Sequence, residues 1–230
     1  MFRLHAASKR YRHKDGEVVA LQPTTLEIAR GEFVAVIGPS GSGKTTLLSM
    51  LGGMLAPSDG KVWLDGESLY DASATARARI RQQKLGFVFQ TFNLIPYLSA
   101  LENVQIPLML KGSPSAEDQE RVMALLTKVG LGPRVHHKPS ELSIGQQQRV
   151  ALARTLANDP AVILADEPTG NLDPETREQV LKFLETLRDE GRTVIMVTHD
   201  PDAASRTTRV IKLRDGAVVS DSAARMSQVA

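Results

Sequence analysis

The residues best suited to chemistry stand in one run, Gly38-Pro39-Ser40-Gly41-Ser42-Gly43-Lys44-Thr45-Thr46, which fits the phosphate-binding pattern G-x-x-x-x-G-K-[ST]. Its glycines allow backbone N–H groups to converge on phosphate oxygens, and a helix that starts directly afterwards adds the positive end of its dipole. In such a loop Lys44 reaches the β and γ phosphates, and the Thr45 hydroxyl takes one position on a magnesium ion. The alternative is a glycine-rich surface turn that matches by chance. The apolar segment 33–37 before the run and the helix-like segment 46–51 after it favour a nucleotide site.

Two adjacent carboxylates, Asp166 and Glu167, end an apolar strand expected at 162–165. Ligand sites in open parallel sheets lie at the carboxyl ends of strands, so both acids are expected to face the loop around Lys44. Asp166 suits magnesium, directly or through water, and Glu167 suits the activation of a water in line with the γ-phosphate. The competing interpretation is a strand that ends in solvated acids. The phosphate-binding pattern upstream favours the functional interpretation.

The elements that must position these groups alternate along the chain. Beyond the strands named above, strands are expected at 62–64, 85–89, 193–198, 209–213 and 217–219. Helices are expected after the glycine run, from Ser115, and from Asp173-Pro174 to Gly191. This alternation predicts an α/β fold with a mostly parallel sheet and helices on both faces. The first thirty residues are expected to form short strands around a turn at 14–16, and 91–157 is expected to be an inserted helical segment.

Composition limits the class of protein. The chain of 230 residues, 42% hydrophobic and 23% charged, suits one large α/β domain or a core with an insertion. A net charge of +2 favours neither nucleic acid nor an acidic partner, and the basic cluster at 9–14 is interpreted as the solvated face of a hairpin. The chain has no cysteine, which excludes disulfides and thiolate chemistry. No apolar stretch approaches the ~18–20 residues that span a bilayer, and no signal-peptide pattern is present, so a cytoplasmic location is expected.

The stretch Leu142-Ser143-Ile144-Gly145-Gln146-Gln147-Gln148-Arg149-Val150 stands shortly before the Asp166-Glu167 pair. A serine and a glycine just before a helix offer a hydroxyl and backbone N–H groups to an anion, although a capped helix start would also explain them. The stretch resembles the signature motif of the ATP-binding cassette (ABC) superfamily, usually L-S-G-G-Q. Ser143, Gly145 and Gln146 match that motif, and Ile144 replaces its commoner glycine.

The resemblance covers nearly the whole chain and implies further roles. Gln90 matches the glutamine that contacts magnesium and the attacking water, and His199 matches the histidine that holds the γ-phosphate. Tyr11 matches the aromatic residue that stacks on adenine, although an ordinary half-buried strand tyrosine is the alternative. Asn171-Leu172-Asp173 matches the D-loop of the family, and Asp173 is equally explained as a helix cap.

Three sets of site residues follow from the resemblance. The catalytic set is Glu167, His199 and Gln90. The magnesium ligands are Thr45, Gln90 and Asp166. ATP is expected to contact, in one subunit, Tyr11, Gly38, Pro39, Ser40, Gly41, Ser42, Gly43, Lys44, Thr45, Thr46, Gln90, Asp166 and His199, and, in the other subunit of a dimer, Ser143, Gly145 and Gln146.

Residues 167–173 and 92–104 look more closely like the ATPases of the MacB, LolD and FtsE group. This resemblance implies one ABC ATPase domain over 1–230. Its P-loop NTPase (RecA-like) core and N-terminal antiparallel β subdomain would occupy about 1–90 and 158–230, and its α-helical subdomain about 91–157.

The activity implied is that of a subunit that hydrolyses ATP to ADP and phosphate with magnesium and forms a homodimer around two ATP molecules. It would drive a separate transmembrane permease subunit at the inner face of the cell membrane, without nucleic acid. The transport implied is of the lipoprotein-release or macrolide-export type.

Two other functions stay open at this point. A soluble ABC ATPase that acts on nucleic acid or ribosomes would be expected to carry two cassettes, a long coiled coil or a strongly basic surface, and the sequence has none of these. A regulatory module that binds ATP with little turnover is disfavoured by Glu167 and His199.

The surface for the membrane partner is expected in the apolar stretch 91–104, which Pro96 interrupts. Core packing is the alternative for Leu101 and Val104.

Overall fold

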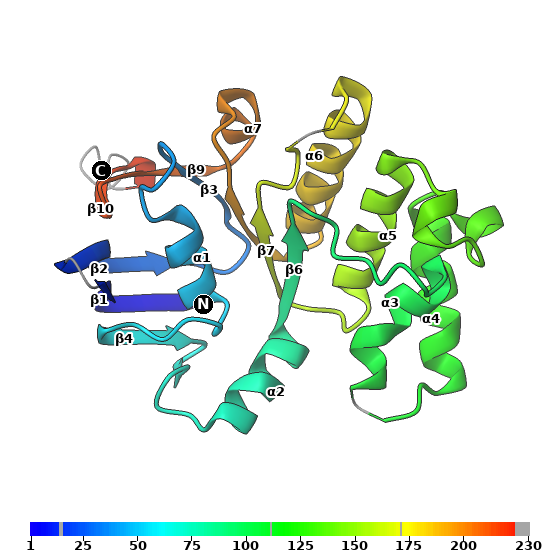
Figure 1. Ribbon diagram of the computed structural model, residues 1–230, viewed down its shortest axis with the longest axis horizontal. Helices are drawn as coiled ribbons and strands as arrows, with labels where there is room; N and C mark the ends of the chain where they lie inside the picture. Colours follow the sequence, from blue (N-terminus) through cyan, green and yellow to red (C-terminus); the bar gives the residue numbers. More distant parts are fainter. Residues whose placement is uncertain (14–15, 111, 171, 224–230) are drawn as a thin grey trace.

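The computed structural model describes residues 1–13, 16–110, 112–170 and 172–223. Its first sheet is antiparallel and has the strand order β2-β1-β4-β5 (Figure 1). The strands are β1 (Phe2–His13), β2 (Gly16–Ile28), β4 (Asp59–Leu64) and β5 (Glu67–Ser68). The prediction of short strands before residue 30 was wrong, because register shifts let β1 and β2 bend while they stay continuous. Part of the turn expected at 14–16 lies outside the described residues.

The second sheet has six strands in the order β10-β9-β3-β8-β7-β6. They are β3 (Phe33–Ile37), β6 (Leu85–Phe89), β7 (Val162–Asp166), β8 (Thr193–Val197), β9 (Arg209–Arg214) and β10 (Ala217–Asp221). All neighbouring pairs are parallel except β9 and β10. The predicted mostly parallel sheet is therefore confirmed.

Layers on both faces explain why the central strands are apolar along their whole length. In β7, Val162 and Leu164 pack into one core, and Ile163 and Ala165 pack into the other. The first face is covered by α1 (Lys44–Leu51) and the antiparallel sheet, and the second by α5 (Ile144–Leu156) and α6 (Pro174–Asp189). A short helix, α7 (Pro201–Ser205), follows β8.

A third core lies among α3 (Ala100–Met109), α4 (Ala116–Lys128) and α5, at the right of Figure 1. Short 3-10 turns, η1 (Gly132–Arg134) and η2 (Pro139–Glu141), connect α4 to α5. The capping box predicted at Ser115 is confirmed, since its hydroxyl accepts from Asp118 N at 3.1 Å and its own N–H donates to the Asp118 carboxylate. These helices form a compact unit beside β6 and β7.

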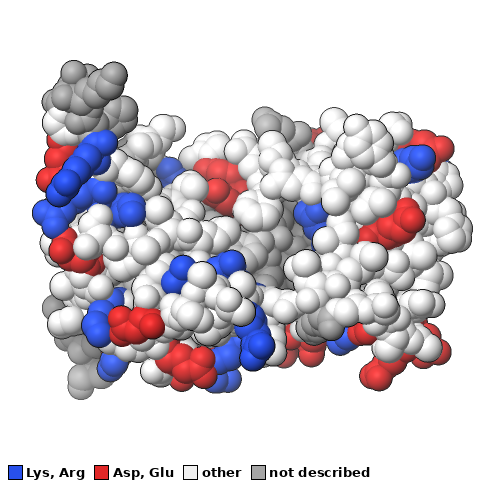
Figure 2. Space-filling view, turned by 60° about the horizontal axis from the view of Figure 1, so that its bottom comes forward, with Lys and Arg blue, Asp and Glu red and all other residues white. Residues whose placement is uncertain are grey.

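The short α7 was not predicted, and neither was α2 (Ala74–Lys84), which precedes β6. None of its residues is fully buried, so it lacks the apolar periodicity by which helices are recognised. Within the described residues, no helix is both long enough and apolar enough to span a bilayer. On the face shown in Figure 2, basic and acidic side chains are interspersed, and no broad area carries a single sign of charge.

Candidate nucleotide-binding site

The glycine run forms the loop between β3 and α1, as predicted. Gly38 and Gly43 adopt positive φ values of 153° and 97°. A Cβ atom on Gly38 would lie 2.2 Å from Leu213 O, and one on Gly43 would lie 2.4 Å from Ala20 O. Because β9 and β2 pass directly against the loop, neither position can accept a larger residue.

The N-terminus of α1 differs from those of the other α-helices in the described part of the chain. Helices α2 to α7 each begin at a serine or aspartate whose side chain accepts a backbone N–H of the first turn. Helix α1 begins at Gly43, which offers no such cap, and has no acidic residue in its first turn. Its first N–H groups and positive dipole end thus suit an anion. A cavity of about 230 Å³ adjoins it, lined by Ala20 and residues 41–46.

Two side chains of α1 extend the site. Lys44 Nζ donates to Gly38 O at 2.8 Å and to Pro39 O at 3.0 Å, which holds the ammonium over the loop. Thr45 Oγ1 donates to Asp166 Oδ1 at 3.4 Å. This weak bond joins the end of β7 to the phosphate loop, so the predicted proximity of Asp166 to the loop is observed.

Asp166 lies in an environment that disfavours its charge. Burial, and then the adjacent charge of Glu167, raise the pKa of Asp166 above its usual value, whereas the Thr45 hydroxyl and the Lys44 ammonium act in the opposite direction. A divalent cation would favour the ionised carboxylate. Hydroxyl and carboxylate oxygens are ligands that Mg²⁺ prefers, so Thr45 and Asp166 fit this ion chemically.

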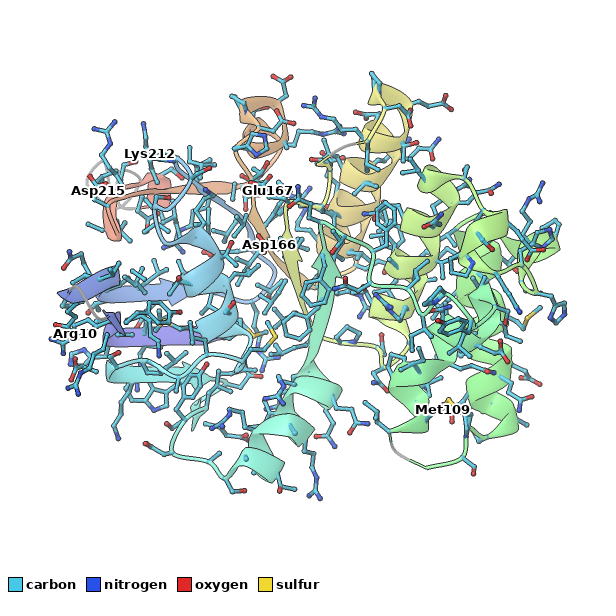
Figure 3. All side chains as sticks on the ribbon, viewed as in Figure 1. Arg10, Met109, Asp166, Glu167, Lys212 and Asp215 are labelled. Atoms are coloured by element: carbon cyan, nitrogen blue, oxygen red, sulfur yellow. The ribbon has the colours of Figure 1, made fainter. Side chains whose placement is uncertain are left out.

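Glu167 and His199 follow the neighbouring strands β7 and β8, and Figure 3 shows Asp166 and Glu167 at the carboxyl end of β7. Glu167 N donates to Val197 O at 2.9 Å. His199 Nδ1 lies 2.9 Å from Glu167 Oε1, and the side chains of His199 and Glu167 are 73% and 16% exposed. The His199 backbone N–H also donates to Glu167 Oε2, at 3.4 Å, so His199 contacts both carboxylate oxygens. A fixed, largely buried carboxylate of this kind can accept a proton from water.

Gln90 directly follows β6, which pairs with β7. A Cβ atom on Gly170 would lie 3.2 Å from Gln90 Nε2 and 3.3 Å from Glu167 O. The Gln90 amide therefore lies against the turn that follows Glu167. The predicted residues that the structure brings to one end of the sheet are Lys44, Thr45, Gln90, Asp166, Glu167 and His199.

Tyr11 lies on the hairpin that borders the loop. It pairs with Val18, two residues before Ala20, and is 40% exposed. Lys9 Nζ lies 5.3 Å from the centroid of its ring. The ring is thus partly open, as stacking on a base requires.

Ser143, Gly145 and Gln146 lie at the start of α5, which β6 and β7 separate from α1 in Figure 1. Ser143 Oγ accepts from Gln146 N at 3.3 Å, and Ser143 N donates to Gln146 Oε1 at 2.9 Å. The adjacent Ile144 is 61% exposed. Ser143 is exposed as well, so this helix start is accessible to a second molecule.

The D-loop prediction is only partly covered by the structure, because Asn171 lies outside the described residues. Asp173 caps α6 by accepting from Glu175 N at 3.1 Å and from Thr176 N at 3.0 Å. The interpretation of Asp173 as a helix cap is therefore confirmed.

Sequence reasoning missed Gln148, a buried polar residue of α5 that contacts the turn after Glu167. A signal was present in its spacing. Gln148 stands four and eight residues before Leu152 and Leu156, on the apolar face of the predicted helix. A polar residue at such a position needs a specific partner.

A glycine loop that leads from a parallel strand into an uncapped helix, with carboxylates at the end of another strand of the same sheet, defines a P-loop nucleotide-binding domain. A family model described as ABC transporter matches residues 21–170. The chain belongs to the ABC transporter family, and its domain is an ABC ATPase that binds ATP.

Individual relatives agree with this assignment. An uncharacterized ABC transporter ATP-binding protein of Thermotoga maritima is 48% identical over 202 residues, which cover 88% of this chain and 86% of the relative. The macrolide export ATP-binding/permease protein MacB of Hyphomonas neptunium is 47% identical over 222 residues, covering 96% of this chain and 34% of the relative. This chain therefore spans about a third of the length of that MacB protein.

A solved structure has the same fold. The ATP-binding cassette MJ0796, a dimer in a post-hydrolysis state bound to ADP and Pi, matches with a TM-score of 0.89 and 44% identity. The match covers 96% of this chain and 97% of that one.

Proposed function

We propose that this chain is the ATP-hydrolysing subunit of an ABC transporter, which dimerises around two ATP molecules and drives a separate permease subunit at the inner face of the cell membrane. The observation that carries the proposal is the Glu167 carboxylate, oriented by His199 at the end of the sheet where Lys44 begins α1. The name of the MacB relative joins ATP binding to a permease, and the MJ0796 cassette is a dimer. Of the two transport types implied by the sequence, lipoprotein release and macrolide export, the name of the MacB relative favours macrolide export.

Each side chain has a role in this proposal. Lys44 and the N–H groups at the start of α1 bind the β and γ phosphates. Thr45, Gln90 and Asp166 hold magnesium, which when bound neutralises charge on the phosphates. Tyr11 stacks on adenine.

Two residues act in the hydrolysis step. Glu167 orients a water molecule and accepts its proton as the water attacks the γ-phosphate. His199 keeps the carboxylate in place and donates to the γ-phosphate.

A second copy of the chain completes the site. The hydroxyl of Ser143 and the first N–H groups of α5 are suited to an anion and are open to another molecule. In the proposed dimer Ser143, Gly145 and Gln146 contact the ATP that is held by the partner's loop. ATP then forms much of the interface, so the chain should be largely monomeric without nucleotide.

Ser143→Arg should block ATP-dependent dimerisation and hydrolysis and leave ATP binding to the monomer unchanged, because a bulky cation replaces the small hydroxyl at the interface. Nucleotide titration and size-exclusion chromatography with Mg-ATP measure the two effects. Ser115→Arg, which alters the equivalent capping serine of α4, is the matched control and should dimerise normally. Loss of ATP binding in the Ser143 variant would instead assign Ser143 to its own subunit's pocket.

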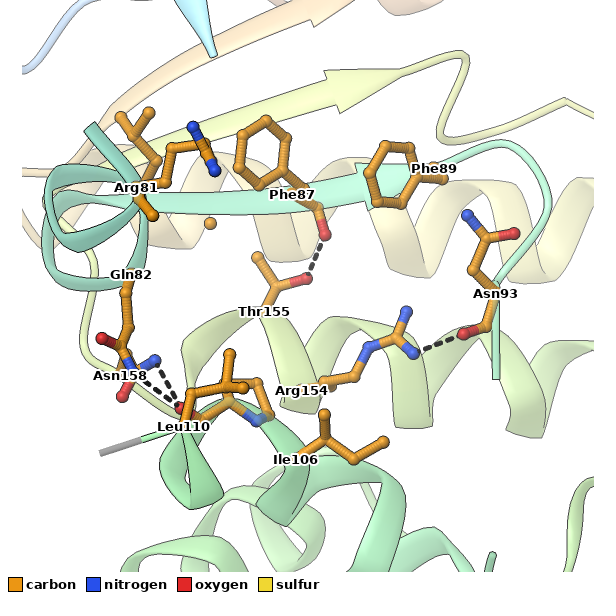
Figure 4. A pocket seen from close by; sticks show the side chains of 14 residues that line it. Arg81, Gln82, Phe87, Phe89, Asn93, Ile106, Leu110, Arg154, Thr155 and Asn158 are labelled. Atoms are coloured by element: carbon orange, nitrogen blue, oxygen red, sulfur yellow. Dashed lines mark hydrogen bonds between the residues drawn. The ribbon is translucent and has the colours of Figure 1, made fainter. Parts of the chain in front are cut away.

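The permease is proposed to dock in a groove of about 490 Å³ between α2, β6, α3 and α5 (Figure 4). Its apolar lining includes Phe87, Phe89, Ile106 and Leu110, and its charged groups are Arg81 and Arg154. The Arg154 guanidinium donates to Phe92 O and Asn93 O, each at 2.6 Å. These bonds tie the start of the stretch 91–104 to the rim of the groove, two residues after Gln90. A displacement of Gln90 on nucleotide binding would therefore be transmitted to the docking surface.

The rest of that stretch divides between core and surface. Val104 is fully buried, and Leu94 and Leu101 pack against the core of the helical unit, so core packing explains them. Leu94→Asp is therefore expected to disturb folding and is unsuited to test docking. Tyr97, 81% exposed, is the better probe. This shared core supports 91–157 as a helical subdomain inserted into the remainder of the chain.

Tyr97→Asp should leave folding, ATP binding and basal ATPase activity unchanged, reduce co-purification with the permease, and remove the permease's effect on the ATPase rate. A charge in an apolar interface is the physical reason. Met123→Asp changes an exposed apolar residue of α4 that lies outside both the stretch 91–104 and the groove lining, and it serves as the control. Normal assembly of the Tyr97 variant would show that docking lies elsewhere.

The function is tested by steady-state phosphate release with Mg-ATP, with and without the proposed permease subunit. We expect the chain alone to hydrolyse ATP and the complex with the permease to hydrolyse it at a different rate. ATP binding without turnover in both samples would support a regulatory module instead.

A further inference from the structure

Gln148 is a polar side chain with 0% of its surface exposed. Its Nε2 donates to Pro168 O at 3.0 Å, and its Oε1 has no hydrogen-bond partner among the residues that the structure describes. Leu152 and Leu156 occupy the same helix face, so an apolar side chain of similar size would suit the position. A buried amide that is only half satisfied lowers the stability of the fold. The residue therefore needs an explanation other than stability.

Its partner, Pro168, lies in the turn that directly follows Glu167. Glu167 has a φ of 47°, which a non-glycine residue adopts only where its surroundings hold it. Glu167 N donates to Val197 O at 2.9 Å, and Gly170 N donates to Glu167 O at 3.0 Å. Proline has no N–H, so its carbonyl is the only backbone hydrogen-bonding group at position 168. Gln148 supplies the hydrogen bond that holds this part of the turn.

Gln148 also stands five residues after Ser143, the cap of the same helix. Five residues of α-helix span about 7.5 Å. The reciprocal bonds between Ser143 and Gln146 order the first turn of α5. One rigid element thus carries both the exposed helix start and the amide that holds the Pro168 carbonyl.

We propose that Gln148 is a positioning residue. It fixes the position of the turn at Pro168, and through that turn the position of the Glu167 carboxylate, relative to α5. The inference rests on the proposed function, because it takes Glu167 as the general base. A displacement of the exposed start of α5 is then transmitted to the Glu167 carboxylate of the same chain. Occupation of the interface would in this way adjust the catalytic group of the subunit that supplies the helix.

Gln148→Met tests the inference, since methionine retains the length of the side chain and removes both polar atoms. We expect kcat to fall by about tenfold to a hundredfold, because small displacements of a catalytic group have effects of this size. The dissociation constant for ATP should stay at the wild-type value, and the thermal unfolding temperature should be unchanged or higher. A residue with a merely structural role would lower the unfolding temperature and leave kcat of the folded protein unchanged.

Gln179→Met is the matched control. It removes the same amide from α6, where Nε2 donates to Glu175 Oε1 at 3.4 Å, away from the Glu167 turn. This variant should keep kcat close to wild type. An equal fall of kcat in both variants would contradict a specific role of Gln148.

A second measurement places Gln148→Met in the Glu167→Gln background. If Gln148 acts through the carboxylate, the second substitution should cause no further loss of the residual turnover and should leave the ATP-dependent dimer intact. A further loss, or loss of the dimer, would overturn the inference. If wild type is active, Glu167→Gln is inactive and Gln148→Met is normal, the inference alone fails. An inactive wild-type chain would contradict the proposed function itself.

Discussion

The Glu167→Gln variant should bind ATP with wild-type affinity and hydrolyse it about 10²–10⁴-fold more slowly, the usual contribution of general base catalysis. The amide preserves the shape of the side chain but cannot accept a proton. The Glu167 side chain follows the end of β7 and contacts His199, and an amide of the same shape fits the same place. The substitution should therefore leave the strand and the phosphate loop unchanged. Phosphate release and nucleotide titration on the same preparation measure both quantities.

The same variant should also trap a closed dimer, since ATP at the interface is no longer removed. Size-exclusion chromatography with Mg-ATP should show a lasting dimer, and chromatography without nucleotide should show a monomer. Glu117→Gln makes the same chemical change on the exposed first turn of α4 and should behave as wild type. Unchanged hydrolysis by Glu167→Gln would refute the role of Glu167 as the base.

The second large effect is expected for Lys44→Ala. This variant should lose ATP binding, whereas Glu167→Gln loses only hydrolysis. Lys44 Nζ is held over the loop by Gly38 O and Pro39 O, and its contacts to phosphate would be charge-assisted. Losing several such contacts, at about 1.5–3 kcal/mol each, weakens affinity by at least about tenfold. Nucleotide titration measures the change.

The control for this variant is Lys182→Ala, which removes an exposed lysine on α6. It should bind ATP normally. Both variants should unfold at nearly the wild-type temperature, because neither side chain is part of a core. Near-normal ATP affinity of Lys44→Ala would show that the loop does not bind the phosphates.

The sequence predicted most of the sheet and the location of the site because the relevant signals are local. Strands buried on both faces, such as β7 and β8, appear as short apolar runs. The glycine run is specific in its spacing, and the caps at Ser115 and Asp173 obey local hydrogen-bonding rules. The gathering of Asp166 and Glu167 near Lys44 then follows from the rule that sites lie at the carboxyl ends of parallel strands.

The features that were missed depend on contacts between distant segments. The close approach of Ala20 and Leu213 to Gly43 and Gly38 is set by how the two sheets pack, and no local pattern reports it. Helix α2 lacks a buried face and so lacks apolar periodicity, and it is held by tertiary bonds such as that from Arg81 to Gly53 O at 2.9 Å. The bond from Gln148 to Pro168 joins positions twenty residues apart. In each case the deciding interaction is tertiary.

In the proposed mechanism, ATP is hydrolysed at a site completed by a second copy of the chain. The most direct test is the rate of phosphate release per subunit, measured at saturating Mg-ATP over about a hundredfold range of protein concentration that spans the dimer dissociation constant. This rate should rise with concentration towards a plateau, and Ser143→Arg should stay inactive throughout. A rate per subunit that is constant over the whole range, and equal in wild type and Ser143→Arg, would contradict the proposed mechanism.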